Sequence, residues 1–125
     1  MIEPGIGLTM LSPLEKAVLE MMLEKPNEHI EVIRQQLAHA QVGRREFTGV
    51  GFFTRFLIPS DATVRRDLPN MEIRNVAAEF PGMQHGAGFV LFIRDGVISM
   101  LEGFTYDEPW PEQTDKFSLK RSGAT

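Results

Sequence analysis

The 125-residue sequence contains no cysteine. This absence excludes disulfide bonds, thiolate nucleophiles and zinc sites built on cysteine. Because small secreted domains commonly depend on disulfides, the composition favours a cytoplasmic protein. The first residues, 1–5, also lack the basic start and apolar run of a signal peptide.

Long apolar runs and an excess of positive charge are missing as well. The longest apolar run, residues 89–93, is far shorter than the ~18 residues of a membrane-spanning helix and indicates a buried strand. The net charge at pH 7 is −4, whereas nucleic-acid binding typically needs a basic stripe. We therefore expect neither a membrane nor a nucleic acid as partner.

The familiar catalytic and cofactor motifs are absent too. Gly-x-Gly pieces occur at residues 5–7, 49–51 and 86–88, but none completes a dinucleotide-binding motif or a P-loop. No serine lies in a G-x-S-x-G setting. His29 and His39 lack metal-ligand spacing, so we predict no metal site and no cofactor. These absences favour a non-enzymatic protein over an enzyme.

The overall composition is that of a globular protein. The apolar fraction is 42% and the charged fraction 24%, both ordinary values. No repeat or linker divides the chain. We predict a single domain over residues 1–125, with residues 1–11 and 122–125 as loose ends.

Helix signals come first along the chain. Ser12, Pro13 and Glu15 form the pattern of a capping box at the start of one helix. Lys25-Pro26 ends this helix, and Asn27 can cap a second one. We therefore expect two N-terminal helices.

Strand signals follow. Strands are predicted over residues 47–58, 72–80, 89–94, 97–104 and 117–120. Asp95-Gly96 is a strong signal for a two-residue hairpin turn with positive φ at both residues. Helices grouped before strands indicate an α+β fold: two helices packed on an antiparallel β-meander of four to five strands.

A two-residue turn fixes the register of its strands. Counting back from the turn places Phe89 opposite Glu102 and Gly88 opposite Gly103. Glu102 then lies on an otherwise apolar face. Burial there would raise the pKa of its carboxyl group unless a donor or cation compensates.

The same register, carried past the glycines, brings His85 and Tyr106 to the face of Glu102. These three residues are candidates for a pocket, with Glu102 as base or acceptor, His85 as proton carrier and Tyr106 as donor. In the alternative interpretation Glu102 and Tyr106 hydrogen-bond the following loop, and His85 is a loop residue with its own hydrogen bonds satisfied. A β-bulge at Gly86 or Gly88 would turn the side chains beyond it to the opposite face and so separate the three residues.

The segment 106–112 is acidic and aromatic. Asp107 and Glu108 have no basic residue near them in sequence, and Trp110, the only tryptophan, lies between two prolines. Trp110 either closes the edge of the core or anchors a partner protein together with Asp107 and Glu108. An acidic patch of this kind would attract a basic protein.

Three segments resemble a family of small bacterial proteins of uncharacterised function: EFTGVGFF at 46–53, QHGAGF at 84–89 and LEGFTYDEPWP at 101–111. The resemblance covers about residues 12–121 and implies a bacterial, cytoplasmic protein without bringing an activity, a cofactor or catalytic residues. The layout is also similar to that of small immunity-type inhibitors, which is an analogy at the level of fold.

Two functions therefore stand at this point. The first is a non-enzymatic binding or inhibitory protein of the immunity type, with a basic protein as partner. The second is a small-ligand-binding protein or minor enzyme that uses His85, Glu102 and Tyr106. The sequence does not decide the oligomeric state.

Overall fold

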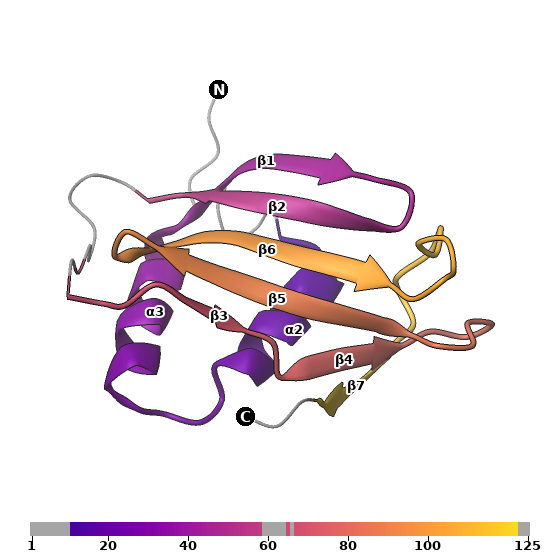
Figure 1. Cartoon of the computed structure of the whole chain (residues 1–125), viewed down its shortest axis with the longest axis horizontal. Helices are drawn as coiled ribbons and strands as arrows, with labels where there is room; N and C mark the ends of the chain where they lie inside the picture. Colours follow the sequence, from indigo (N-terminus) through magenta and orange to yellow (C-terminus); the bar gives the residue numbers. More distant parts are fainter. Residues whose placement is uncertain (1–10, 59–64, 66, 123–125) are drawn as a thin grey trace.

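The computed structural model describes residues 11–58, 65 and 67–122 (Figure 1). Within these residues the chain forms two helices, α2 (Pro13–Met22) and α3 (Glu28–His39), followed by one seven-stranded antiparallel sheet. The predicted α+β class with an antiparallel sheet is confirmed. Most of the predicted loose ends, residues 1–10 and 123–125, lie outside the described residues.

The strands are β1 (Gln41–Phe47), β2 (Gly51–Leu57), β3 (Met71–Ile73), β4 (Val76–Glu79), β5 (Ala87–Arg94), β6 (Val97–Thr105) and β7 (Ser118–Arg121). Their order in the sheet is β1-β2-β6-β5-β4-β7, and β3 also pairs with β5. The order differs from a simple meander because β2 pairs with β6 and β7 returns to β4.

The strand count exceeds the expected four to five because two predicted strands each contain a break. The segment 47–58 includes the end of β1, a turn and β2, and Gly49 in this turn has a φ of 88°. The segment 72–80 is interrupted at Arg74 and Asn75, so that β3 and β4 both pair with β5. A period of two in the sequence continues through such short breaks and does not reveal them.

Both helices begin where their capping residues predict. The Ser12 hydroxyl oxygen accepts a hydrogen bond from the Glu15 N–H at 3.0 Å, and the Glu15 carboxylate accepts one from the Ser12 N–H at 2.8 Å. This is the predicted capping box. The Asn27 side chain accepts from the Ile30 N–H at 2.9 Å and caps α3.

The helices lie together on one face of the sheet, and we call the other face the open face (Figure 1). The core lies between helices and sheet. Its fully buried members are apolar side chains from both layers, among them Val18, Leu19, Ile33, Phe89, Leu91, Ile93, Ile98 and Leu101.

Gln36 connects α3 to the β5–β6 hairpin from within this core. Its side chain is 0% exposed. Its amide nitrogen donates to the Gly96 carbonyl at 2.7 Å, and its amide oxygen accepts from the Ile98 N–H at 2.9 Å. A buried amide with its groups bonded in this way fixes the position of the helix over the turn.

The turn itself is as predicted. Asp95 and Gly96 have φ values of 55° and 82°, and Arg94 pairs with Val97 across them. Positive φ at both residues is what a type I′ turn requires.

The predicted register beyond the turn is wrong. Ile93 pairs with Ile98, as expected, but Phe92 pairs with Met100, so that Ser99 is an extra residue on β6. Such a β-bulge turns every later side chain of the strand to the opposite face.

The bulge changes the neighbours of Glu102. Glu102 pairs with Val90 instead of Phe89, and Gly103 takes the place opposite Phe89. Gly88, in turn, pairs with Phe104. Glu102 therefore points to the open face and not into the core.

We expect Gln36→Leu to lower the free energy of unfolding by about 1–3 kcal/mol, because the Ile98 N–H then loses its acceptor in the core and the Gly96 carbonyl loses one of its two donors, keeping the Arg65 N–H. Urea unfolding of the variant beside wild type measures the loss. The matched control is Gln35→Leu at the exposed neighbouring position, where the change should stay within about 0.5 kcal/mol. Equal losses in both variants would contradict the role given to Gln36.

Candidate functional site

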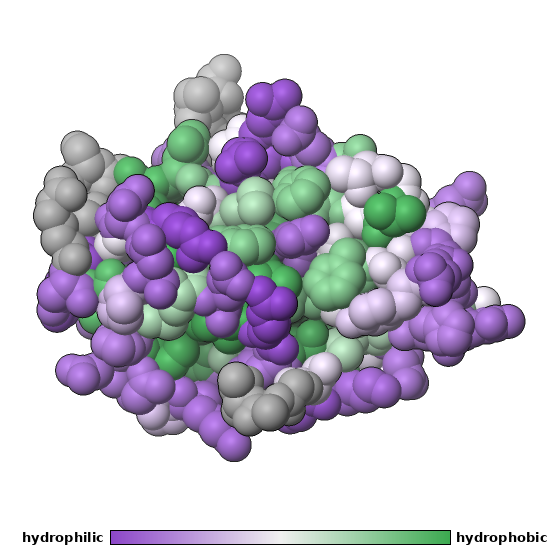
Figure 2. Space-filling view, in the orientation of Figure 1, coloured by the Kyte–Doolittle hydropathy of each residue, from purple (hydrophilic) through white to green (hydrophobic). Residues whose placement is uncertain are grey.

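The open face carries a group of apolar side chains over β2, β6 and β5, which we call the open-face patch (Figure 2). Its members are Phe53, Val90, Phe92, Met100, Phe104 and Tyr106. None of these residues belongs to the core cluster or packs against it among the described residues. Tyr106 is 49% exposed. Val90 is buried, and the other four side chains are half-buried. A contiguous group of partly exposed apolar side chains is typical of an interaction site.

Glu102 lies at the centre of this patch. It pairs with Phe53 on β2 and with Val90 on β5. Met100 and Phe104 precede and follow it by two residues on β6, and therefore share its face. Within the described part of the chain, no residue gives the Glu102 carboxylate a hydrogen bond or an ion pair.

The surroundings of Glu102 disfavour its charge. Burial raises the pKa of its carboxyl group above the ordinary value, and the positive charge of Arg74 offsets this effect in part. A valine at this position would instead add a favourable cross-strand pair with Phe53 and Val90. A residue that costs stability at the centre of an exposed apolar patch is typical of a binding site.

A glycine gives the patch its shape beside Glu102. A Cβ atom at Gly88 would lie 2.7 Å from the Phe104 ring and 2.7 Å from the Tyr106 hydroxyl. The two aromatic rings thus lie over the backbone of β5. They contact each other edge to face, with centroids 5.4 Å apart, and form a rigid wall of the patch.

Arginines surround the patch. Arg44 and Arg55 face each other across β1 and β2, an unfavourable pairing of like charges. On the other side Arg94 lies 5.2 Å above the Phe92 ring and forms an ion pair of 2.8 Å with Glu72. Arg44 also forms an ion pair of 3.3 Å with Glu46, which pairs with Phe53. The rim therefore carries both signs of charge around an acidic centre.

The three candidates for a pocket are only partly brought together. Glu102 and Tyr106 share the open face. His85 is exposed in the loop before β5, and its backbone N–H donates to the Glu108 carboxylate at 2.8 Å. Among the described contacts, none joins the His85 side chain to Glu102 or Tyr106.

Glu108 has a structural role within the tail. Its carboxylate accepts hydrogen bonds from the backbone N–H groups of Gln84 and His85, and these bonds lower its pKa. It thereby holds the tail against the loop before β5. Asp107 is exposed next to it, with a φ of 59°.

Trp110 is partly buried and contacts aromatic side chains of the core. Its ring centroid lies 5.2 Å from that of Phe52, 5.9 Å from Phe80 and 6.4 Å from Phe89. Its backbone N–H donates to the Gly49 carbonyl at 2.8 Å. These contacts favour the interpretation that Trp110 closes the edge of the core.

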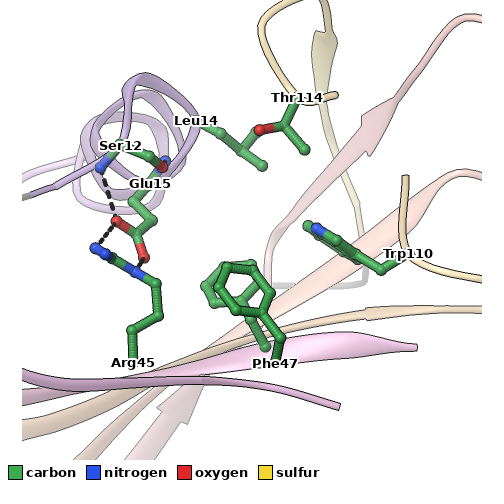
Figure 3. A pocket seen from close by; sticks show the side chains of 8 residues that line it. Ser12, Leu14, Glu15, Arg45, Phe47, Trp110 and Thr114 are labelled. Atoms are coloured by element: carbon green, nitrogen blue, oxygen red, sulfur yellow. Dashed lines mark hydrogen bonds and ion pairs between the residues drawn. The ribbon is translucent and has the colours of Figure 1, made fainter. Parts of the chain in front are cut away.

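A small cleft of about 140 Å³ lies on the helix side, between the start of α2, β1 and the tail (Figure 3). It is lined by Ser12, Leu14, Glu15, Arg45, Phe47, Phe52, Trp110 and Thr114. The sequence analysis did not find this cleft, because its walls come from segments that are distant in sequence.

One wall of the cleft is an ion pair. Glu15 is 2% exposed, and Arg45 donates to its two oxygens at 2.7 and 3.0 Å. The Thr54 hydroxyl also donates to this carboxylate. The only sequence signal for Glu15 was its place in the capping box, which gives no hint of Arg45 or Thr54.

Other features of the described residues add no function. They contain no group of three or more side chains suited to hold a metal ion. Neither α2 nor α3 has the length and apolar character needed to cross a lipid bilayer. Comparison of the chain with protein-family models, with curated proteins and with solved structures gave no match.

We expect Glu102→Val to raise the free energy of unfolding by about 0.2–1 kcal/mol at about pH 7, because valine pairs better with Phe53 and Val90. Glu102→Gln should show the same dependence on pH, with a smaller increase in the free energy of unfolding. Urea unfolding of both variants and wild type, between about pH 4 and about pH 7, measures the effect.

The sign of the pH trend follows from the raised pKa of Glu102. Folding favours the protonated carboxyl group, so its contribution to stability is complete below the unfolded pKa and is lost as pH rises through the folded pKa. The gap between each variant and wild type should therefore widen from about pH 4 to about pH 7. A gap independent of pH would show that Glu102 is not shielded from water.

Proposed function

We propose that this chain is a non-enzymatic binding protein, inhibitory in the manner of an immunity protein, whose open face receives a basic side chain of a partner protein. The observation that carries the proposal is Glu102, a carboxylate surrounded by apolar side chains and given no hydrogen bond by the described residues. An arginine or lysine of the partner would supply the missing donors and the opposite charge.

The aromatic rings beside Glu102 support a cationic group as the centre of the contact. Phe53 pairs directly with Glu102, and Phe104 lies next to it on the same face. A cation held over aromatic faces gains roughly 0.5–2 kcal/mol, the more so when water is excluded. The combination of one carboxylate with several rings is selective for a cation, because a neutral group would leave the carboxylate without a partner.

The extent of the patch favours a protein over a small molecule. Its residues come from three neighbouring strands, which form a broad surface. A central charged anchor within apolar contacts that exclude water is the common arrangement of an interaction hot spot. Arg55, which is exposed on the rim, would pair with an acidic residue beside the basic anchor of the partner.

The test is selection of random displayed peptides on the immobilised full chain. We expect the enriched peptides to carry an arginine or lysine at one fixed position, flanked by apolar residues. Glu102→Gln should weaken a selected peptide by about tenfold or more, equivalent to about 1.4 kcal/mol. Replacing the peptide arginine by citrulline, or its lysine by norleucine, should have little further effect in the Glu102→Gln variant.

The matched control is Glu112→Gln, which removes an exposed carboxylate outside the open-face patch and should leave binding unchanged. Because Glu102→Gln is expected to be at least as stable as wild type, its loss of binding would not reflect unfolding. Enrichment without a basic residue would overturn the proposal. So would a dimer of this chain that dissociates in Glu102→Gln, since the occupant would then be a second copy.

A further inference from the structure

The small cleft between the start of α2, β1 and the tail lies on the helix side of the sheet, opposite the open-face patch. It is independent of the proposed function. Three of its walls are aromatic: Phe47, Phe52 and Trp110. Phe47 is 68% exposed, which leaves a large apolar surface at the mouth of the cleft. Phe47 and Phe52 lie with ring centroids 6.3 Å apart.

The size of the cleft fits one aromatic ring. Its volume is about 140 Å³. An apolar cavity of about 150 Å³ is large enough to take up benzene. Rings of the wall can contact a bound ring edge to face, as they contact one another in the core.

The polar groups of the cleft call for an uncharged ligand. Glu15 and Arg45 form an ion pair with bonds to both carboxylate oxygens, so their charges cancel within the wall. A charged ligand would therefore lose water without gaining a counter-charge. The indole nitrogen of Trp110 and the hydroxyl of Thr114 lie at the edge of the cleft (Figure 3). They offer a donor and a hydroxyl to a polar substituent.

We propose that this cleft binds an uncharged aromatic ring that carries a hydroxyl group, a ligand of the phenol class. The ring lies between Phe47, Phe52 and Trp110, with Leu14 above it. Its hydroxyl exchanges hydrogen bonds with Thr114 and the Trp110 indole N–H.

Trp110 provides the readout, because it is the only tryptophan and its indole N–H gives a single resonance. Phenol is added to the ¹⁵N-labelled full chain, and shifts are followed by NMR. We expect saturable shifts of the indole N–H and of the backbone amides of Leu14, Glu15 and residues 45–47, with a Kd on the order of 1 mM. Benzoate, which is charged, and cyclohexanol, which is not aromatic, should bind at least about tenfold more weakly.

Variants separate the ring from the hydroxyl group. Phe47→Ala should weaken phenol binding about fivefold or more. Because Phe47 is exposed, its replacement should leave the fold intact. Thr114→Val should weaken phenol but leave toluene unchanged, because only the hydrogen bond is lost. The control Leu57→Ala removes another exposed apolar side chain, outside the cleft, and should change nothing.

Each contrary result would overturn the assignment. Shifts that do not saturate, or that miss the indole N–H, would show that phenol does not enter the cleft. Equal binding of benzoate or cyclohexanol would contradict the ligand class. Unchanged phenol binding in Phe47→Ala would contradict the position of the ring.

Discussion

The buried carboxylate of Glu15 fixes the arrangement on which the rest of the structure depends. It accepts hydrogen bonds from Ser12 at the helix start, from Arg45 on β1 and from Thr54 on β2. A buried charge with fewer donors would be too costly to keep, so these bonds hold α2 against both strands. Gln36 does the same for α3 and the β5–β6 turn. With both helices fixed on one face, no helix among the described residues lies on the open face (Figure 1).

The parts of the fold that sequence predicts correctly depend on residues close together in the chain. Ser12 and Asn27 act on backbone groups within one helical turn, and Asp95-Gly96 determines its own φ angles. The register of β5 and β6 depends on more than the turn. Ser99 forms the bulge where β6 pairs with β5, and nothing in its own sequence neighbourhood marks it. The predicted number of strands was too low for a similar reason, because a glycine such as Gly49 fits a turn and a strand equally well.

The sequence predicted some residues of the candidate site, but not the face of the sheet on which they lie. Sequence reasoning identified Glu102 as a carboxylate with a raised pKa in apolar surroundings, and the structure gives it such surroundings on the open face instead of the core. The bulge made the difference, because a shift of one residue moves a side chain through the sheet. His85 and Glu108 were assigned separately, whereas the structure joins them through a backbone hydrogen bond. A contact between two loops of this kind leaves no repeating pattern in the sequence of either loop.

Glu15 and Glu102 place the same type of side chain in opposite settings on the two faces of the sheet. Glu15 has its donors supplied by the chain itself, so it contributes to a fixed structure and has little capacity left for a ligand. Glu102 is half-buried between Phe53, Val90 and their neighbours, which shield it partly from water but donate no hydrogen bond. Its charge is therefore disfavoured in the separate protein, where the positive charge of Arg74 offsets the burial only in part, and a donor from outside would stabilise it further. A surface of this kind gains more from a cation than a fully solvated carboxylate would, because part of the desolvation has already taken place on folding.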